Sequence, residues 1–255
     1  MNFLQLFLLF VTATLGGTLN SVAGGGTFFT FPSLIFAGVP PIQANATSSV
    51  ALWPGSAASV GAYWNELKKQ KASLIIVLSV TSLIGGIAGA FLLLDTSQAT
   101  FVHLIPWLLL LATVLFTFNK PIVALLRIET KSEVSWKSLL GVAVLQIIIA
   151  IYGGYFGGGI GILMLASLAI MGMDNIHEMN SIKTLLTIII NGVAVIIFIA
   201  RGVVFWPQAI VMIVGATLGG YGGAYLARKV DQKWVRLFVT IVGFSLTLYF
   251  FIKQV

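Results

Sequence analysis

Long apolar stretches fill most of the chain, and short polar stretches separate them. The apolar stretches cover residues 2–23, 27–38, 42–64, 72–94, 101–118, 138–156, 160–172, 177–200, 203–227 and 234–252. A helix needs about 20 residues to cross the hydrocarbon core of a bilayer. Stretches 27–38 and 160–172 are too short for this, and each directly follows three consecutive glycines, at 24–26 and 157–159.

Each glycine triplet predicts a break in a helix. Glycine destabilises a helix by about 1 kcal/mol relative to alanine, so three in succession end it. Inside a membrane, the backbone groups that such a break leaves unpaired are tolerated only where they face protein or a wet cavity. Two breaks at corresponding places in two halves of a chain are typical of a transporter binding site.

The two halves of the chain repeat one another. Corresponding glycines and asparagines recur in the same order about 134 positions later, which indicates a duplication. The matched positions are Gly-Gly-Ile-Ala-Gly-Ala at 85–90 with Gly-Gly-Tyr-Gly-Gly-Ala at 219–224, Gly38 with Gly172, and Asn45 with Asn180. We therefore divide the chain into a first membrane repeat over 1–118, a cytoplasmic linker over 119–137 and a second membrane repeat over 138–255.

The paired GGxxGA sequences predict helix packing. Small residues one turn apart let two helix backbones approach closely within a membrane. We interpret Gly85, Gly89, Gly219 and Gly223 as packing residues rather than as part of a site.

The basic residues of the loops distinguish two arrangements of the halves. Lys and Arg concentrate at 65–71, 119–137 and 228–236, and such loops are usually cytoplasmic. If every long stretch spans, there are eight crossings, the repeats are parallel, and nine basic residues lie inside and four outside. Alternatively, 2–38 and 138–172 are re-entrant hairpins with glycine tips. Each half then keeps three spans, and the repeats are inverted. In this arrangement eleven basic residues lie inside and two outside. We favour the inverted arrangement, which puts both termini outside.

Composition agrees with an all-α integral membrane protein of the cytoplasmic membrane. The chain is 58% hydrophobic and 8% charged, whereas a soluble domain carries about 25% charged residues. The net charge of +7 lies in the loops, so it indicates topology rather than nucleic-acid binding. The absence of cysteine excludes disulfides and thiol catalysis. With no Walker A or HExxH sequence, we expect no enzyme, no cofactor and no metal.

Lys183 is the most informative single residue. It lies inside the 177–200 stretch, about 10 Å beyond the expected helix start, and a charge at this depth indicates function unless the side chain snorkels to the interface. It belongs to one polar stripe at helical spacing, which must face protein or water. The stripe comprises Asn180, Lys183, Thr184, Thr187 and Asn191.

The first half has a similar stripe without a charge. After Pro40 and Pro41, which suit the start of a helix, the 42–64 stretch carries its polar residues on one face. These are Asn45, Ser48, Ser49, Ser56 and Ser59. They line a site or join helices by hydrogen bonds.

The 177–200 helix has a polar start. Asn175 with Glu178 predicts a capping box. Histidine is the side chain that most often changes charge near neutral pH, so His177 and Glu178 are candidates for proton coupling, against a purely structural role at the interface.

These residues together predict an anion site. If 27–38 and 160–172 are half-helices, their N-termini bring partial positive charge to the membrane centre, and Lys183 adds a full charge. The predicted substrate-binding residues are Gly24, Gly25, Gly26, Asn45, Thr47, Ser48, Gly157, Gly158, Gly159, Gly161, Asn180, Lys183 and Thr187.

The chain resembles the TauE/SafE sulfite exporter family over its whole length. The resemblance rests on Ala23-Gly24-Gly25-Gly26-Thr27, Pro32-Ser33-Leu34, Gly38, Asn45-Ala46-Thr47-Ser48, the run Gly153 to Gly161, Asn180-Ser181 and the GGxxGA pair. Family members often carry Thr-Ser where this chain has Ile182-Lys183, a departure that bears on substrate choice. The resemblance implies a transporter of sulfur-containing anions such as sulfite, thiosulfate or organosulfonates, usually an exporter.

We therefore expect a secondary transporter of a small anion that works by alternating access. Its partners are the anion, the lipid bilayer and, as one coupling ion, the proton. An anion channel and a structural membrane subunit of a larger complex are the alternatives, and the sequence leaves the oligomeric state open.

Overall fold

The computed structural model describes residues 2–22, 25–58, 64–118, 121–122, 136–173, 175–226 and 232–253, and every regular element in these ranges is a helix. The helices are α1 (Phe3–Val22), α2 (Thr27–Phe36), α3 (Pro41–Ala58), α4 (Trp64–Leu67), α5 (Ala72–Asp95), α6 (Gln98–Thr117), α8 (Trp136–Tyr155), α9 (Ile160–Ile170), α10 (Ile176–Ala200), α11 (Trp206–Leu226) and α12 (Gln232–Lys253). Within the described residues, four helices are long and apolar enough to cross a membrane, namely α1, α5, α6 and α10. The all-helical membrane fold is thereby confirmed.

Both predicted helix breaks are present. α1 ends at Val22 and α2 begins at Thr27, while α8 ends at Tyr155 and α9 begins at Ile160. The breaks need glycine because Gly25, Gly157 and Gly159 have φ angles of 118°, 77° and 73°, a region that residues with a Cβ rarely adopt. Gly24 lies outside the described residues.

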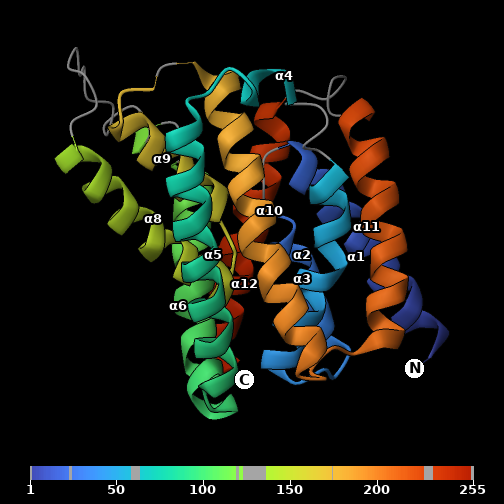
Figure 1. Cartoon of the computed structure of the whole chain (residues 1–255). Coiled ribbons are helices and arrows are strands. Elements are labelled where there is room, and N and C mark those ends of the chain that lie inside the picture. The colour runs from blue at the N-terminus through green and yellow to red at the C-terminus, as the bar shows by residue number, and fades with distance from the viewer. Residues whose placement is uncertain are drawn as a thin grey trace.

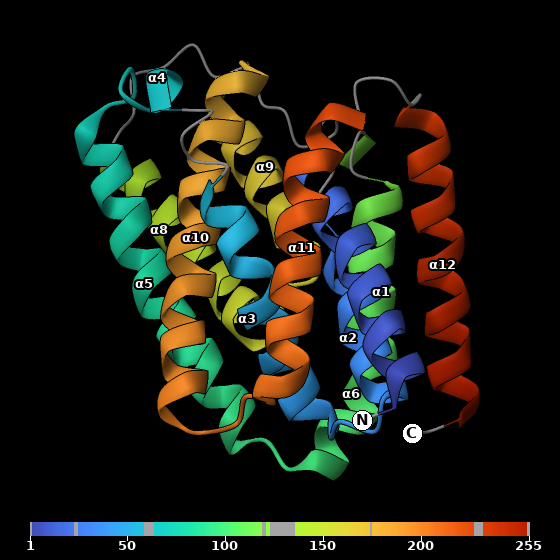
Figure 2. The same ribbon diagram turned by 90° about the vertical axis from the view of Figure 1, so that its right-hand side faces the viewer.

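The two broken helices form hairpins that enter the bundle from opposite ends (Figures 1 and 2). α1 starts at the end that carries both termini, and α2 returns to that end; α8 starts at the opposite end, near α4, and α9 returns there. The start of α12 lies at the α4 end, and its last residues lie at the end of the bundle that also carries the N-terminus. This is the arrangement expected for two re-entrant hairpins. The inversion symmetry, the sidedness and the division at 119–137 stay predictions.

The first helix of each hairpin packs against a long helix of the other half. α1 packs along α11, and α8 packs along α5. A methyl group on Gly85 would lie 2.7 Å from the Ile147 carbonyl oxygen, and one on Gly219 would overlap the Thr14 carbonyl. The interpretation of these glycines as packing residues is therefore confirmed, except for Gly223, whose surroundings are not described.

Two helix starts test the local predictions. α3 begins at Pro41, as expected from the two prolines. α6 begins at Gln98, three residues before the apolar stretch 101–118. The Ser97 hydroxyl accepts a hydrogen bond from the Thr100 backbone N–H at 3.1 Å, which caps the helix earlier than the apolar pattern indicates.

Candidate functional site

A cavity of about 160 Å³ lies where both broken helices meet the long helices of both halves. Its volume is roughly ten times the ~10–15 Å³ that a single buried water needs. The polar or glycine residues that line it are Gly17, Asn20, Gly25, Thr27, Ser49, Gly55, Ser56, Gly157, Gly159, Gly161, Lys183, Thr184, Thr187, Asn191 and Gly220. Leu52, Phe156, Ile160, Ile162, Leu165 and Ala216 complete the lining.

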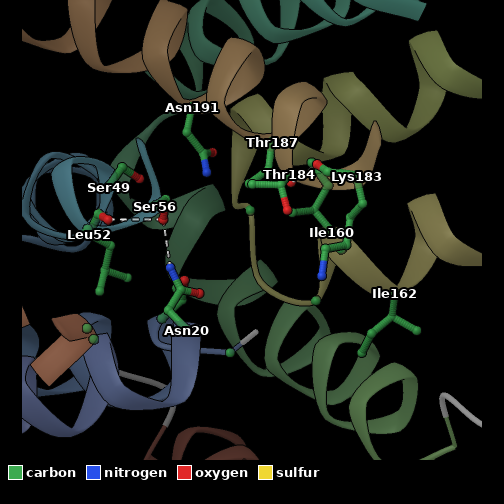
Figure 3. Close-up of a pocket in the computed structure, with 18 of the residues that line it drawn as sticks. Asn20, Ser49, Leu52, Ser56, Ile160, Ile162, Lys183, Thr184, Thr187 and Asn191 are labelled. Carbon is green, nitrogen blue, oxygen red and sulfur yellow. Dashed lines mark hydrogen bonds between the residues drawn. The ribbon is translucent and has the colours of Figure 1, made fainter. Parts of the chain in front are cut away.

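The α10 side of the cavity carries the predicted polar stripe. Lys183, Thr184, Thr187 and Asn191 all line the space, and Figure 3 shows Lys183, Thr184 and Thr187 on the side near Ile160. The Thr187 hydroxyl donates to the Lys183 backbone carbonyl at 2.8 Å, which fixes its direction within the helix. The expectation that this stripe faces protein or water rather than lipid is confirmed, although Asn180 is half-buried outside the lining.

Lys183 lies directly against the start of α9. A methyl group on Gly161 would be 3.3 Å from Lys183 Cδ and 3.9 Å from Cε. The lysine stem therefore runs along α9 because Gly161 has no side chain. The first turn of α9 and the lysine both bring positive charge to this part of the cavity.

The opposite side of the cavity carries neutral hydrogen-bonding groups. Asn20 Nδ2 donates to Ser56 Oγ at 2.9 Å, which joins α1 to α3, and Figure 3 shows this pair across the space from Lys183. Ser49 lies beside Ser56, and its hydroxyl donates to the Asn45 carbonyl at 3.0 Å. These groups surround the cavity with amide and hydroxyl donors and acceptors.

Lys183 is the one charged residue among those that line the cavity. Within the described residues it forms no ion pair and no side-chain hydrogen bond. A partly buried cation beside a helix N-terminus, without a carboxylate, is electrostatically unsatisfied and attracts an anion. This charge makes the cavity a candidate anion site.

Three predicted binding residues of α3 lie elsewhere, in bonds between helices. Asn45 donates to the Tyr155 carbonyl, Thr47 accepts from the Phe205 backbone N–H, and Ser48 shares a hydrogen bond of 2.6 Å with Thr30. All three are buried and outside the lining.

Two glycines of the triplets also lie outside the lining. A methyl on Gly26 would lie 2.5 Å from the Gly16 carbonyl oxygen, and one on Gly158 would lie 2.8 Å from the Phe156 ring. Both positions therefore serve close packing of the hairpins.

The polar start of α10 lies apart from the cavity. The Asn175 side chain accepts from the His177 backbone N–H at 3.0 Å, so Asn175 caps α10, but the second bond of the predicted capping box is absent. Glu178 accepts from the Asn175 side-chain amide at 3.2 Å instead of the backbone N–H that a capping box uses. His177 is exposed, and neither His177 nor Glu178 lines the cavity.

The sequence did not single out Asn20 and Trp53. Asn20 lines the cavity from α1. The sequence feature that could have identified it is a single amide side chain near the end of an otherwise apolar helix. Trp53 Nε1 donates to the Ile188 carbonyl at 3.2 Å, and its indole fits against Gly192, where a methyl would lie 3.1 Å from Nε1. This contact joins α3 of the first half to α10 of the second.

The fold and the cavity are those of a polytopic membrane protein with a partly polar internal cavity. The sequence model described as Sulfite exporter TauE/SafE matches residues 9–250, and the chain belongs to this family. It is a multi-pass protein of the cell membrane.

Three relatives that match over most of their own length are also described as probable membrane transporter proteins. The chain is 26% identical over 245 residues to a probable membrane transporter protein of Haemophilus influenzae, covering 95% of this chain and 92% of the relative. It is 28% identical over 243 residues to the probable membrane transporter protein YfcA of Escherichia coli K12, covering 94% and 87%. It is 26% identical over 244 residues to the probable membrane transporter protein ORF9 of a Sinorhizobium species, covering 94% and 90%. No solved structure matched the chain.

Proposed function

We propose that this transporter is a secondary exporter of small sulfur-containing anions, such as sulfite, thiosulfate or an organosulfonate, and that it works by alternating access. The observation that carries the proposal is Lys183, the one charged residue of a cavity that both halves line. The family description, Sulfite exporter TauE/SafE, supports the sulfur oxyanion as the substrate class.

In this proposal the anion lies between the start of α9 and the α10 stripe. Lys183 supplies the charge, and Thr187 supplies a hydroxyl. Gly157, Gly159 and Gly161 let the backbone approach the anion, as Gly25 does from the first hairpin. Asn180 and Gly24, the latter outside the described residues, stay predicted contacts, whereas we assign Asn45, Thr47 and Ser48 to positioning the helices.

Uptake of labelled sulfite, thiosulfate and methanesulfonate into proteoliposomes tests the proposal. We expect saturable transport of at least one of these anions, acceleration by the same anion inside the vesicle, and loss of transport in Lys183→Met. Conductance far above carrier turnover, without exchange, would identify an anion channel instead. No transport of any of the three anions would contradict the proposed substrate class.

A further inference from the structure

Hydrogen bonds join the two halves near the end of the bundle that carries both termini. Asn45 Nδ2 of α3 donates to the Tyr155 carbonyl at 2.9 Å, at the last residue of α8. The Phe205 backbone N–H, just before α11, donates to Thr47 Oγ1 of α3 at 3.1 Å. Asn45 is 1% exposed and Thr47 is 0% exposed, so no water competes for these bonds.

Aromatic rings also join the two halves at the same end. Phe31 of α2 meets Phe156 edge to face at 5.6 Å between ring centroids, and Phe101 of α6 meets Tyr155 at 5.8 Å. Each pair joins a first-half ring to a second-half ring, and such pairs contribute attraction beyond the area that they bury. We call Phe31, Asn45, Thr47 and Phe101, with their partners Tyr155, Phe156 and Phe205, the terminal-side gate.

The terminal-side gate lies between the cavity and the end that carries both termini. α3 starts at that end and runs toward α4 (Figure 2). Asn45 and Thr47 belong to its first two turns, whereas Ser49, Leu52 and Ser56 line the cavity further along. The cavity therefore lies on the α4 side of these contacts.

The second half has no matching contacts at the α4 end within the described residues. Asn180 corresponds to Asn45 in the repeat. Its side chain is half-buried and forms no hydrogen bond with any of the described residues. Ile182 corresponds to Thr47 and has no hydrogen-bonding side chain. Within the described residues, contacts of this kind between the halves therefore lie on the terminal side and have no counterpart at Asn180 and Ile182.

The closing bond of Asn45 is also incomplete. Its Nδ2 is bonded, but its buried Oδ1 has no partner. A buried acceptor without a partner destabilises the state that contains it. The Asn45 amide is therefore only half satisfied in this state, and opening the gate breaks one hydrogen bond of Asn45 instead of two.

We propose that Asn45 and Thr47 are positioning residues that hold the terminal-side gate closed while the cavity is reached from the α4 side. This inference rests on the alternating access of the proposed function. When the gate opens, Asn45 releases the Tyr155 carbonyl and Thr47 releases the Phe205 N–H, and the second hairpin separates from α3. Neither residue has to touch the anion.

A reporter cysteine in the cavity tests the inference, because the chain has no cysteine of its own. The full chain with Ser49→Cys is placed in oriented vesicles and treated from either side with a membrane-impermeant maleimide. We expect faster labelling from the α4 side. Adding Asn45→Leu or Thr47→Val raises labelling from the terminal side by about three- to tenfold, as the loss of one net hydrogen bond allows.

The matched control is Gln43→Leu. Gln43 Oε1 accepts from Gln98 Nε2 at 2.6 Å at the same end, but both residues belong to the first half. Labelling should stay as in the parent, and Asn45→Gln, which keeps an amide donor, should restore part of the closure. Equal labelling from both sides in the parent, or unchanged labelling in both Asn45→Leu and Thr47→Val, would overturn the inference.

Sulfite uptake by the same vesicles separates the gate from the proposed function. Side-dependent labelling that changes as expected, without sulfite transport, would contradict the substrate but keep the gate. Transport with unchanged labelling would contradict the gate alone.

Discussion

Lys183 and Gly161 are in contact across the start of α9, since a methyl group on Gly161 would lie 3.3 Å from Lys183 Cδ. The glycine therefore decides how closely the lysine stem lies along α9 and where its ammonium group enters the cavity. A small change at residue 161 should act through the lysine, not through the fold.

Gly161→Ala should slow transport by about two- to tenfold, because the lysine must shift by a few tenths of an ångström from its binding position. Uptake into proteoliposomes measures this. Gly141→Ala is the control, since nothing lies within 4 Å of a methyl group there. Equal transport in the two variants would show that the contact does not position Lys183.

Gly89→Ala should destabilise the fold by about 1–3 kcal/mol. A methyl group on Gly89 would overlap the Ile151 carbonyl oxygen and lie 2.8 Å from the Tyr155 backbone nitrogen, so α5 and α8 would have to separate. Thermal unfolding in detergent measures the loss. Gly222→Ala of the second GGxxGA sequence meets nothing within 4 Å and should unfold at the parent temperature; equal loss in both would contradict the packing role.

Cysteines at Lys68 and Lys253 should label from opposite sides of the membrane. α12 ends at Lys253, at the end of the bundle opposite α4, whereas Lys68 directly follows α4. Side-specific maleimide labelling of Lys68→Cys and Lys253→Cys measures this. Labelling of both from one side would favour the eight-span parallel arrangement.

His177→Gln should keep transport and its pH dependence. His177 is exposed at the start of α10, and its contact with Asn175 uses the backbone N–H, which glutamine retains. Uptake between pH 5 and 8, where histidine titrates, checks this. A flattened pH profile would instead assign proton coupling to His177.

Features that depend on residues close together along the chain were predictable from the sequence. Three glycines in succession break a helix wherever they occur, and the glycines of GGxxGA lie one turn apart on any helix. The spacing of Lys183, Thr187 and Asn191 likewise fixes one face of α10, whatever packs against it.

Features that depend on contacts across the chain were not predictable. Asn45 is paired with a backbone carbonyl 110 residues away, and Asn20 with a serine 36 residues away. A repeat pattern marks Asn45 as important but does not distinguish an anion contact from a bond between helices. The same limit explains why Ser49 and Ser56 line the cavity while Ser48, on the same predicted stripe, is bonded to Thr30.

Binding of sulfite to the purified full chain, measured by titration calorimetry on the parent and on Lys183→Met, tests the central claim most directly. Methionine keeps most of the lysine stem but removes the charge, and Lys253→Met, at an exposed helix end, controls for net charge. A hydrogen bond to a charged group contributes about 1.5–3 kcal/mol, so Lys183→Met should bind sulfite about ten- to a hundredfold more weakly, with Lys253→Met unchanged. Equal affinity in the parent and Lys183→Met would contradict an anion site built around Lys183.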